Sequence, residues 1–387
     1  MPTLLNASFS MKPLLCFLFS MFAWTLIAQN SKEIRYVSTM SLRGAEGIYV
    51  YEFDRKTQAT KQIQIIAAGQ NPTFMAIHRN KQFLYAICSE GIERKDGSGG
   101  VIAYRIHPST GELTRLNEQS ANGQGPCHIA IEPRGQFAYV SHYGSGNLAV
   151  LPIAPDGTLG KVTQVIQHEG SSTHERQKSP HVHSMILGHS GQIIYASDLG
   201  TDQIIGYRID PKKGTLSTDA ALATKTQAGA GPRHFVLAAH GRVAYSVEEL
   251  SSTVAVYQVH PKTHALAFVQ RLPMLPEGFS GTNLAADIHL SPDGRFLYAT
   301  NRGHDSIAIF AVQPKTGTLT FVARESTRGG HPRNFLIDPD GQHVWIANRD
   351  GDNVVLFERN TTTGLLNYTG REVKLPAPVC VLPLQLK

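Results

Sequence analysis

Apolar strands that end in an aromatic residue recur at a regular distance along the chain. Each is preceded by a turn rich in Gly or Pro and is followed by a second turn of the same kind. The aromatic positions are 47 to 56 residues apart, and they are Tyr36, Tyr85, Tyr139, Tyr195, Tyr245, Tyr298 and Trp345. A repeat of roughly 40–50 residues that contains several short strands is typical of the blades of a β-propeller. The pattern therefore predicts an all-β protein with seven blades and little helix.

The third repeat shows the expected strands of one blade most clearly. Gly125 and Pro126 introduce an apolar inner strand, and further strands follow at 136–142 and 148–153. Gly, Asn, Asp and Pro fill the connecting segments, and these residues supply the backbone angles that tight hairpins need. A fourth strand is expected after the turn at Gly157. Each blade should therefore contain four antiparallel strands.

The two ends of the repeat array are expected to share one blade. Most inner strands begin with a proline, and the last such residue, Pro378, is followed by one short apolar segment, 379–384. The first repeat begins at Glu33 with what is a second strand in the other repeats. We therefore expect the C-terminal strand to join the first blade as its innermost strand, because closing the ring removes exposed sheet edges. One inner strand, near 283–287, lacks the proline.

Polar residues gather at positions that this arrangement places at one mouth of the central channel. Neighbouring strands are antiparallel, so every inner strand begins, and every second strand ends, at the same end of the channel. Two long loops, 167–181 and 273–287, are expected to cover this mouth and to contribute to specificity. Taken singly, each polar residue could be a solvated strand end, but convergent titratable groups favour a functional site. The predicted site comprises His128, His142, His183, Asp198, Arg233, His234, Glu249, Asp287, His289, Asn301, Arg302 and Arg333.

The charges of this site favour an anionic ligand over a metal ion. His181 and His183 alternate along a strand and could share a metal, with His289 as a further imidazole. No other ligand has a defined spacing to them, and Arg233 and Arg302 would oppose a cation. Guanidinium groups instead recognise carboxylate or phosphate groups through paired hydrogen bonds. We expect no metal and no other cofactor.

The N-terminal region differs in composition from the repeats. Met11 and Lys12 precede fourteen uncharged, mostly apolar residues, 14–27, and the small residue Ala28 follows. This order resembles a secretory signal with its cleavage site, and the apolar run is shorter than the roughly 20 residues that span a bilayer. We expect residues 1–28 to be a signal peptide and 29–387 to form the propeller. The mature protein should be secreted or periplasmic without stable membrane insertion, and a retained membrane anchor is the alternative.

The composition agrees with a single repeat domain. Among 387 residues, 35 Gly and 21 Pro suit many turns between short strands. The formal net charge of +6 is spread along the chain, so no nucleic-acid partner is expected. After removal of Cys16 with the signal, Cys88, Cys127 and Cys380 remain, which allows one disulfide at most and favours buried thiols. A closed ring has no obligate partner, so a monomer is expected.

Several segments are similar to those of a known family. They include GPCHIAIEPRGQFAYVSHYGSGNLAVLPI, VEELSSTVAVY and AADIHLSPDGRFLYATNRGHDSIAIFAV. These segments resemble the seven-bladed propeller lactonases of the bacterial 6-phosphogluconolactonase family, which are related to a fungal carboxymuconate cyclase. The resemblance extends over Glu33–Leu384 and implies metal-independent hydrolysis of a sugar lactone at the channel mouth. The residues that it suggests as catalytic are His183 in PHVHS, Arg233 in GPRH, Glu249 in VEEL and Arg302 in NRGHDS.

The remaining residues of the predicted site are expected to bind the substrate, and other functions fit the same pattern. A propeller can bind a small anion, a glycan or a protein partner without turnover, because fold does not imply function. A lactone-forming cyclase or an isomerase is a further alternative. The expected export also bears on the substrate. Since 6-phosphogluconolactone is made in the cytoplasm, an exported enzyme would meet a different sugar lactone.

Overall fold

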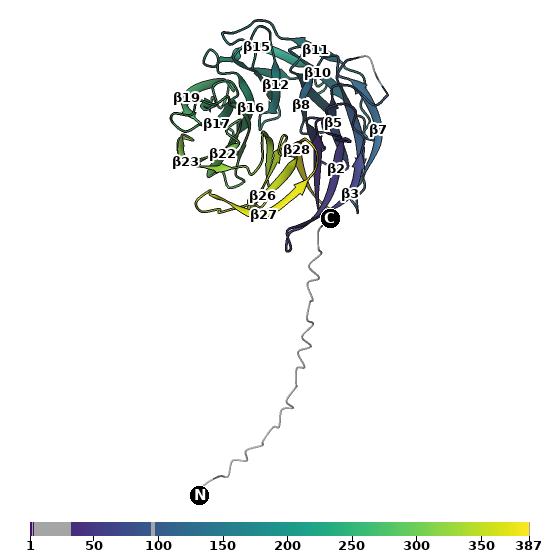
Figure 1. The fold of residues 1–387 in the computed structure, drawn as a ribbon, viewed down its shortest axis with the longest axis vertical. Helices are drawn as coiled ribbons and strands as arrows, with labels where there is room; N and C mark the ends of the chain where they lie inside the picture. The colour runs from purple at the N-terminus through teal and green to yellow at the C-terminus, as the bar shows by residue number, and fades with distance from the viewer. Residues whose placement is uncertain (2, 4–31, 94–96, 387) are drawn as a thin grey trace. The chain divides into compact units, whose positions relative to one another are not determined.

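The chain folds into a ring of β-sheets around a central channel (Figure 1). The computed structural model describes residues 1, 3, 32–93 and 97–386, and these residues form 28 strands and no helix. Every sheet has four antiparallel strands, which confirms the prediction of seven four-stranded blades. The described residues accordingly contain no helix that could cross a membrane. The predicted signal segment lies almost wholly within residues 4–31, outside the described residues, and it stays a prediction.

The strands of each blade run in sequence order from the channel outwards, except in the first blade, where the C-terminal strand is innermost. From inner to outer strand, the seven blades are β28 (Pro378–Gln385), β1 (Glu33–Thr39), β2 (Ile48–Asp54) and β3 (Ala59–Ile66); β4 (Met75–Ile77), β5 (Phe83–Cys88), β6 (Gly100–Ile106) and β7 (Leu113–Ser120); β8 (Pro126–Ile131), β9 (Phe137–His142), β10 (Asn147–Pro152) and β11 (Gln164–Gln167); β12 (Val182–Leu187), β13 (Ile193–Asp198), β14 (Gln203–Ile209) and β15 (Leu216–Lys225); β16 (Pro232–Leu237), β17 (Val243–Glu248), β18 (Thr253–Val259) and β19 (Leu266–Pro273); β20 (Leu284–Leu290), β21 (Phe296–Arg302), β22 (Ser306–Val312) and β23 (Leu319–Ser326); β24 (Pro332–Ile337), β25 (His343–Asn348), β26 (Asn353–Arg359) and β27 (Leu366–Lys374).

The ring closes where the two ends of the described chain pair in one sheet. β28 is antiparallel to β1, and Tyr36 lies opposite Leu382 in the register. β28 also contacts β24 of the last blade and β4 of the second blade, so it completes the wall of the channel. The predicted closure by the C-terminal strand is confirmed.

The core consists of apolar layers between neighbouring blades. Buried side chains form seven clusters, and each joins the facing sheets of two adjacent blades. In six blades the repeated tyrosine also crosses this layer. Tyr245, for example, is buried and its hydroxyl donates to the carbonyl oxygen of Gly317 in the next blade, at 2.9 Å. Each such tyrosine therefore joins two blades as well as filling the core between them.

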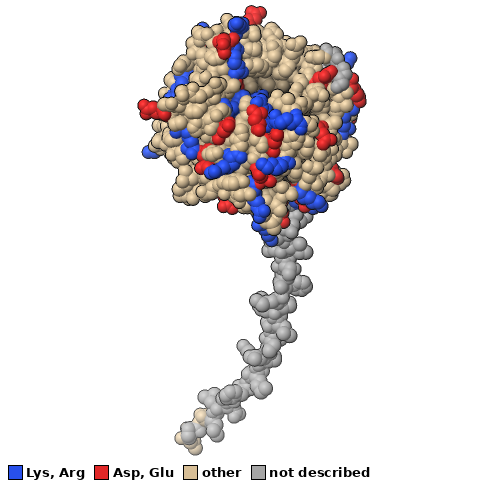
Figure 2. All heavy atoms as spheres, in the orientation of Figure 1, with Lys and Arg blue, Asp and Glu red and all other residues tan. Residues whose placement is uncertain are grey.

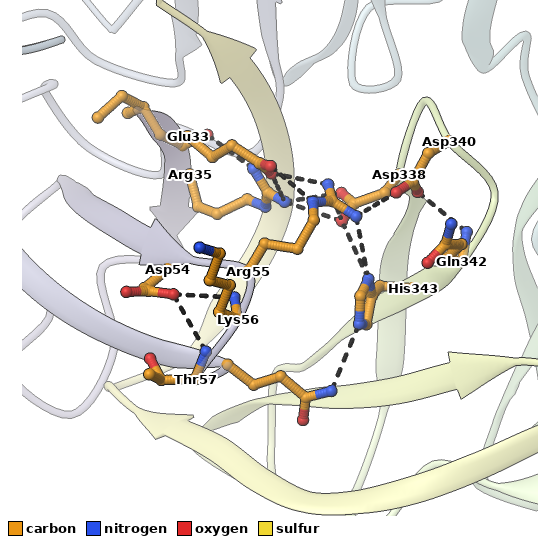
Figure 3. Close-up of polar contacts among 12 residues, drawn as sticks. Glu33, Arg35, Asp54, Arg55, Lys56, Thr57, Asp338, Asp340, Gln342 and His343 are labelled. Carbon is orange, nitrogen blue, oxygen red and sulfur yellow. Dashed lines mark hydrogen bonds and ion pairs between the residues drawn. The ribbon is translucent and has the colours of Figure 1, made fainter. Parts of the chain in front are cut away.

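The seventh interface, between the last and the first blade, is held differently. Its repeat aromatic is Trp345, whose ring meets that of Phe53 edge-on with centroids 4.8 Å apart. Arg35 of β1 donates from Nη2 to both carboxylate oxygens of Asp338, each at 2.9 Å. Arg55 also donates to Asp338, at 3.4 Å (Figure 3). A buried ion-pair network thus takes the place of the tyrosine hydrogen bond where the chain ends meet.

The three cysteines of the ring are buried thiols. Cys88, Cys127 and Cys380 lie on three different inner or second strands, and no disulfide joins them. The favoured interpretation from the sequence is therefore confirmed.

The tyrosine bridges between blades predict a measurable loss of stability. Replacing Tyr245 by Phe keeps the ring but leaves the Gly317 carbonyl without its donor, so Tyr245→Phe should lower the free energy of unfolding by about 1–2 kcal/mol. Chemical unfolding followed by fluorescence would measure this difference. The matched control is Tyr368→Phe, because Tyr368 is exposed, and an equal loss in both variants would contradict the bridging role.

Candidate active site

A bulge at the start of the inner strands turns one side chain of each towards the channel mouth. In β16, Pro232 pairs with Glu248 and His234 pairs with Val247, so Arg233 has no partner in the ladder. The same one-residue shift occurs at His183 and at Arg333. Bulges re-aim side chains and are common beside active sites. Three of the predicted site residues therefore owe their orientation to the same local irregularity.

The re-aimed side chains meet residues from the ends of the second strands around one cavity. The cavity has a volume of about 290 Å³. Its wall is formed by Met40, Asn71, Thr73, Ser89, Gly125, Pro126, Cys127, Tyr143, Arg176, His183, Glu249, Arg302 and Arg333. The structure thus brings His183, Glu249, Arg302 and Arg333 of the predicted set together, and Arg233 lies against Glu249.

Glu249 is the only carboxylate in the wall of this cavity and is surrounded by guanidinium groups. Its Oε2 accepts a hydrogen bond from Nε of Arg233 at 2.9 Å and lies 2.7 Å from Nη2 of Arg302. Its Oε1 lies 2.8 Å from Nη2 of Arg176. Burial alone would raise the pKa of Glu249, but the charges of Arg302, Arg233 and Arg176 lower it to about 2. Glu249 is therefore a permanent anion that holds the arginines.

The backbone of β20 holds two of these arginines from the opposite side. Nη1 of Arg233 donates to the carbonyl oxygen of Ala286 at 2.7 Å, and Nη2 of Arg302 donates to that of Ala285 at 2.8 Å. The backbone N–H of Ala285 donates in turn to the Glu249 carbonyl at 3.1 Å. Proline has no N–H, so it could not make this bond. Ala285 stands at the position where most inner strands have a proline. Its contact with Glu249 therefore explains why this strand lacks the proline.

Arg333 differs from the other arginines because it has no acidic partner. No hydrogen bond or ion pair joins its guanidinium to any residue that the structure describes, and the side chain lies in the cavity wall. Burial lowers the pKa of Arg333 to about 9, with a further contribution from the charges of Arg233 and Arg302. Its donors are thus directed into the cavity and are free to bind a ligand oxygen.

His183 presents an uncharged imidazole to the same cavity. Its Nδ1 is buried and has no hydrogen-bond partner among the described residues. Burial, followed by the charge of Arg233, lowers the pKa of His183 well below 6.5. The ring is therefore neutral at pH 7, and its second nitrogen, Nε2, can accept a proton.

A second layer of predicted residues lies behind His183 and does not line the cavity. The His234 ring contacts that of His183 with centroids 5.3 Å apart and that of His128 at 5.7 Å. Nδ1 of His234 lies 2.7 Å from Asp287, whose other oxygen lies 2.9 Å from Nε2 of His289. These four residues support the cavity from behind.

The remaining three predicted residues, His142, Asp198 and Asn301, are fully buried outside the cavity wall. Asp198, for example, accepts hydrogen bonds from the backbone N–H groups of His181 and Gly200, at 2.8 and 2.9 Å. Neighbouring residues of a strand point to opposite faces, so it is Tyr143 and Arg302, the residues that follow His142 and Asn301, that line the cavity. Their contacts hold the nearby loops and turns.

Arg176 and Tyr143 line the cavity but were absent from the predicted set. Nη2 of Arg176 donates to the Tyr143 hydroxyl at 2.8 Å. Arg176 lies in the loop 168–181, which was expected to cover the channel mouth, but no repeat position marks a loop residue. The second expected loop, which ends at residue 283 before β20, contributes no residue to the cavity wall.

Metal-ligating atoms converge elsewhere. Among the described residues, one group of three such side chains was found, and it consists of Asp338, Asp340 and His343 at the seam between the last and first blades. Arg35 and Arg55 already pair with Asp338. Two guanidinium groups in contact with the same carboxylate oppose a cation, so this cluster does not fit a metal site.

The charge distribution of the cavity is unlike that of the outer surface. On the face shown in Figure 2, basic and acidic side chains are interspersed. In the cavity, by contrast, Arg176, Arg233, Arg302 and Arg333 surround the single carboxylate of Glu249. Such a surplus of positive charge in a concave site attracts anionic ligands.

This charge surplus predicts opposite effects on stability for two substitutions. Arg333→Met should raise the free energy of unfolding by about 1 kcal/mol, because it removes a buried cation that has no ion-pair partner and is repelled by Arg233 and Arg302. Glu249→Gln should lower it by about 3 kcal/mol, because it leaves buried guanidinium groups without their anion. Urea titrations of the two variants beside the wild type would measure both changes. A strong destabilisation by Arg333→Met would show that Arg333 has a structural partner.

Comparison with known proteins agrees with this architecture. The family model described as "Lactonase, 7-bladed beta-propeller" matches residues 34–383. A 6-phosphogluconolactonase of Bacillus subtilis is 38% identical over 308 residues, which are 80% of this chain and 86% of that protein. A protein of the same name from Formosa agariphila is 32% identical over 76% of this chain and 82% of its own length.

Solved structures give the same result. The periplasmic gluconolactonase of Pseudomonas aeruginosa superimposes with a TM-score of 0.87 at 34% identity, over 92% of this chain and all of its own length. The matching residues 34–383 extend over all seven blades except for a few residues at the strand ends of the first, and they include every residue of the cavity wall. The chain therefore belongs to the family of seven-bladed β-propeller lactonases.

Proposed function

We propose that this protein hydrolyses a sugar lactone in the cavity at the channel mouth. The observation that carries the proposal is the pairing of a neutral imidazole, His183, with an unpartnered guanidinium, Arg333, in one cavity wall. These two groups supply a proton acceptor and an oxyanion donor, which are what the opening of a lactone requires. The names of the relatives in B. subtilis and P. aeruginosa support the same reaction.

The reaction can be written with the groups of the cavity alone. Arg333 donates to the carbonyl oxygen of the lactone and stabilises the negative charge that develops there. His183 accepts a proton from water as the water oxygen bonds to the carbonyl carbon. The tetrahedral intermediate then breaks its bond to the ring oxygen, and the His183 imidazolium returns the proton to that oxygen. The product is the open hydroxy acid, and no metal ion takes part.

Glu249 has a positioning role in this mechanism. Both of its oxygens are engaged by Arg233, Arg302 and Arg176, which leaves neither of them available to take a proton from water. By neutralising part of their charge, it holds Arg233 and Arg302 against β20 and so shapes the cavity. His183, whose nitrogen is not engaged in this way, is the better candidate for the general base.

The charge of the cavity favours a lactone that carries an anionic group, and the protein is proposed to act outside the cytoplasm. The export proposal rests on the N-terminal sequence pattern, and it is supported by the periplasmic gluconolactonase among the solved relatives. Binding without turnover and lactone formation are the functions that the following test separates from hydrolysis.

The proposal predicts acid release from a small panel of sugar lactones. Purified protein should release acid from δ-gluconolactone or its 6-phosphate faster than buffer does, and a chelator should not change the rate. His183→Gln should lower kcat by roughly 100-fold, because general base catalysis typically contributes about that much. His107→Gln, which alters an exposed turn, is the matched control and should leave the rate unchanged.

Several outcomes would overturn this proposal. Absence of acid release from every lactone would favour a binding protein, and closure of hydroxy acids to lactones would favour a cyclase. Loss of activity with chelator would contradict the metal-free reaction. An unchanged rate in His183→Gln would remove His183 from the mechanism.

The pH dependence of kcat/KM should differ from that of an enzyme whose general base is a histidine of ordinary pKa. Since the pKa of His183 is lowered well below 6.5, it stays neutral as the pH falls through 6.5, and kcat/KM should persist there. On the alkaline side, Arg333 loses its proton above about pH 9, so kcat/KM should fall beyond that pH. Initial rates corrected for spontaneous hydrolysis would show both limbs. An acid limb centred at 6.5 would contradict the assignment of His183.

A further inference from the structure

Arg176 reaches the cavity from a different element than the other arginines. Arg233, Arg302 and Arg333 lie on the strands β16, β21 and β24. Arg176 instead lies in the loop 168–181 between β11 and β12. Its side chain is about one-third exposed (34%), while those of Arg233 and Arg302 are 2% and 5% exposed. Among Arg176, Arg233 and Arg302, it is therefore Arg176 that an entering ligand can reach most easily.

The backbone that carries Arg176 is firmly held. The next residue, Gln177, is fully buried, and its side chain donates to the carbonyl oxygen of Leu199 at 2.7 Å. The Gln177 carbonyl accepts a bond from the N–H of Ser172 at 2.8 Å, and the Ser172 hydroxyl donates to Asp202 at 2.6 Å. Any rearrangement at this place thus involves the side chain of Arg176 and leaves the loop in position.

The contacts of Arg176 can be exchanged without leaving a backbone group unsatisfied. Arg233 and Arg302 each donate to carbonyl oxygens of β20, and moving them would leave those carbonyls unpaired. Arg176 bonds only to side chains, Tyr143 and Glu249, and both contacts use Nη2. Its Nε and Nη1 have no acceptor among the described residues. Two donors are therefore directed to solvent or ligand.

Removing Arg176 from Glu249 would leave that carboxylate paired through Oε2 and would free Oε1, the oxygen that Arg176 contacts. Glu249 keeps Arg233 and Arg302 on Oε2. An anionic group on the ligand offers Arg176 the same kind of charge-assisted, two-point contact that a carboxylate offers. The exchange of one anion for another costs little, whereas a neutral ligand offers nothing in return for the lost ion pair.

We propose that Arg176 determines the specificity of the cavity for anionic lactones by transferring its side chain from Glu249 to the anionic group of the substrate. This inference rests on the proposed lactone hydrolysis. Arg333 binds the reacting carbonyl, and Arg176 binds the charged substituent away from it. Arg176 thus selects the substrate that is bound, whereas His183 and Arg333 take part in the chemical step.

The experiment compares two substrates that differ only in charge, δ-gluconolactone and its 6-phosphate. Arg176→Ala should lower kcat/KM for the 6-phosphate by roughly 10–100-fold, mainly through KM, because one charge-assisted contact is lost. For δ-gluconolactone the change should stay within about threefold. Arg176→Lys should recover part of the loss, since lysine keeps the charge but not the planar pair of donors.

Lys178→Ala is the matched control, because it removes one positive charge from the same loop at an exposed position outside the cavity wall. It should leave both substrates unchanged. An equal loss on both substrates in Arg176→Ala, or no loss on either, would overturn the specificity role while leaving lactone hydrolysis intact. If the wild type hydrolysed only the neutral lactone and not its 6-phosphate, the specificity role would likewise be overturned and lactone hydrolysis would stand. Failure of the wild type to hydrolyse either substrate would instead overturn the proposed function, and the role of Arg176 with it.

Discussion

The ring can exist only because the two ends of the repeat array pair in one sheet. β28 and β1 are the inner strands of the same blade, and without their pairing the first and last blades would each expose a sheet edge. The closure also fixes the width of the channel, because every inner strand must contact its two neighbours. The cavity at the channel mouth is a consequence of this closed geometry, since its walls come from blades far apart in the sequence.

The interfaces between blades show how a repeated sequence can close on itself. Six of them use the same tyrosine hydrogen bond to the following blade. At the seventh, Trp345 cannot make that bond, and the buried pairing of Arg35 with Asp338 stands in its place (Figure 3). Buried ion pairs are costly to desolvate, and a buried charge that is left without its partner is strongly destabilising. The seam is thereby distinguished from the other interfaces, which helps the first blade pair with the last.

The site is built from local departures from the repeat. His183, Arg233 and Arg333 occupy the bulge that several inner strands share, and they differ where the scaffold residues are the same. β20 departs further, because Ala285 replaces the usual proline and its N–H supports Glu249. Four guanidinium groups around one carboxylate would be unfavourable in a site made for stability alone. The surplus charge is understandable if the cavity receives an anion, which is the state in which its charges are most nearly balanced.

The number of blades, their four strands, the closure by the C-terminal strand and the end of the channel at which polar groups gather could all be predicted from the amino-acid sequence. These features follow from periodicity, from turn residues and from strand direction, which are local or repeated properties. Which of the polar residues face the cavity depends on how the folded strands and loops pack. His142 and Asn301 stand one residue before Tyr143 and Arg302, which line the cavity, and a shift of one residue along a strand reverses the direction of a side chain. Arg176 could not be predicted from the repeated positions, because it lies in a loop. Its contact with Glu249 depends on the path of that loop between blades. The pairing of Arg176 with Glu249 arises only when neighbouring blades pack, and that of Arg35 with Asp338 only when the first blade meets the last.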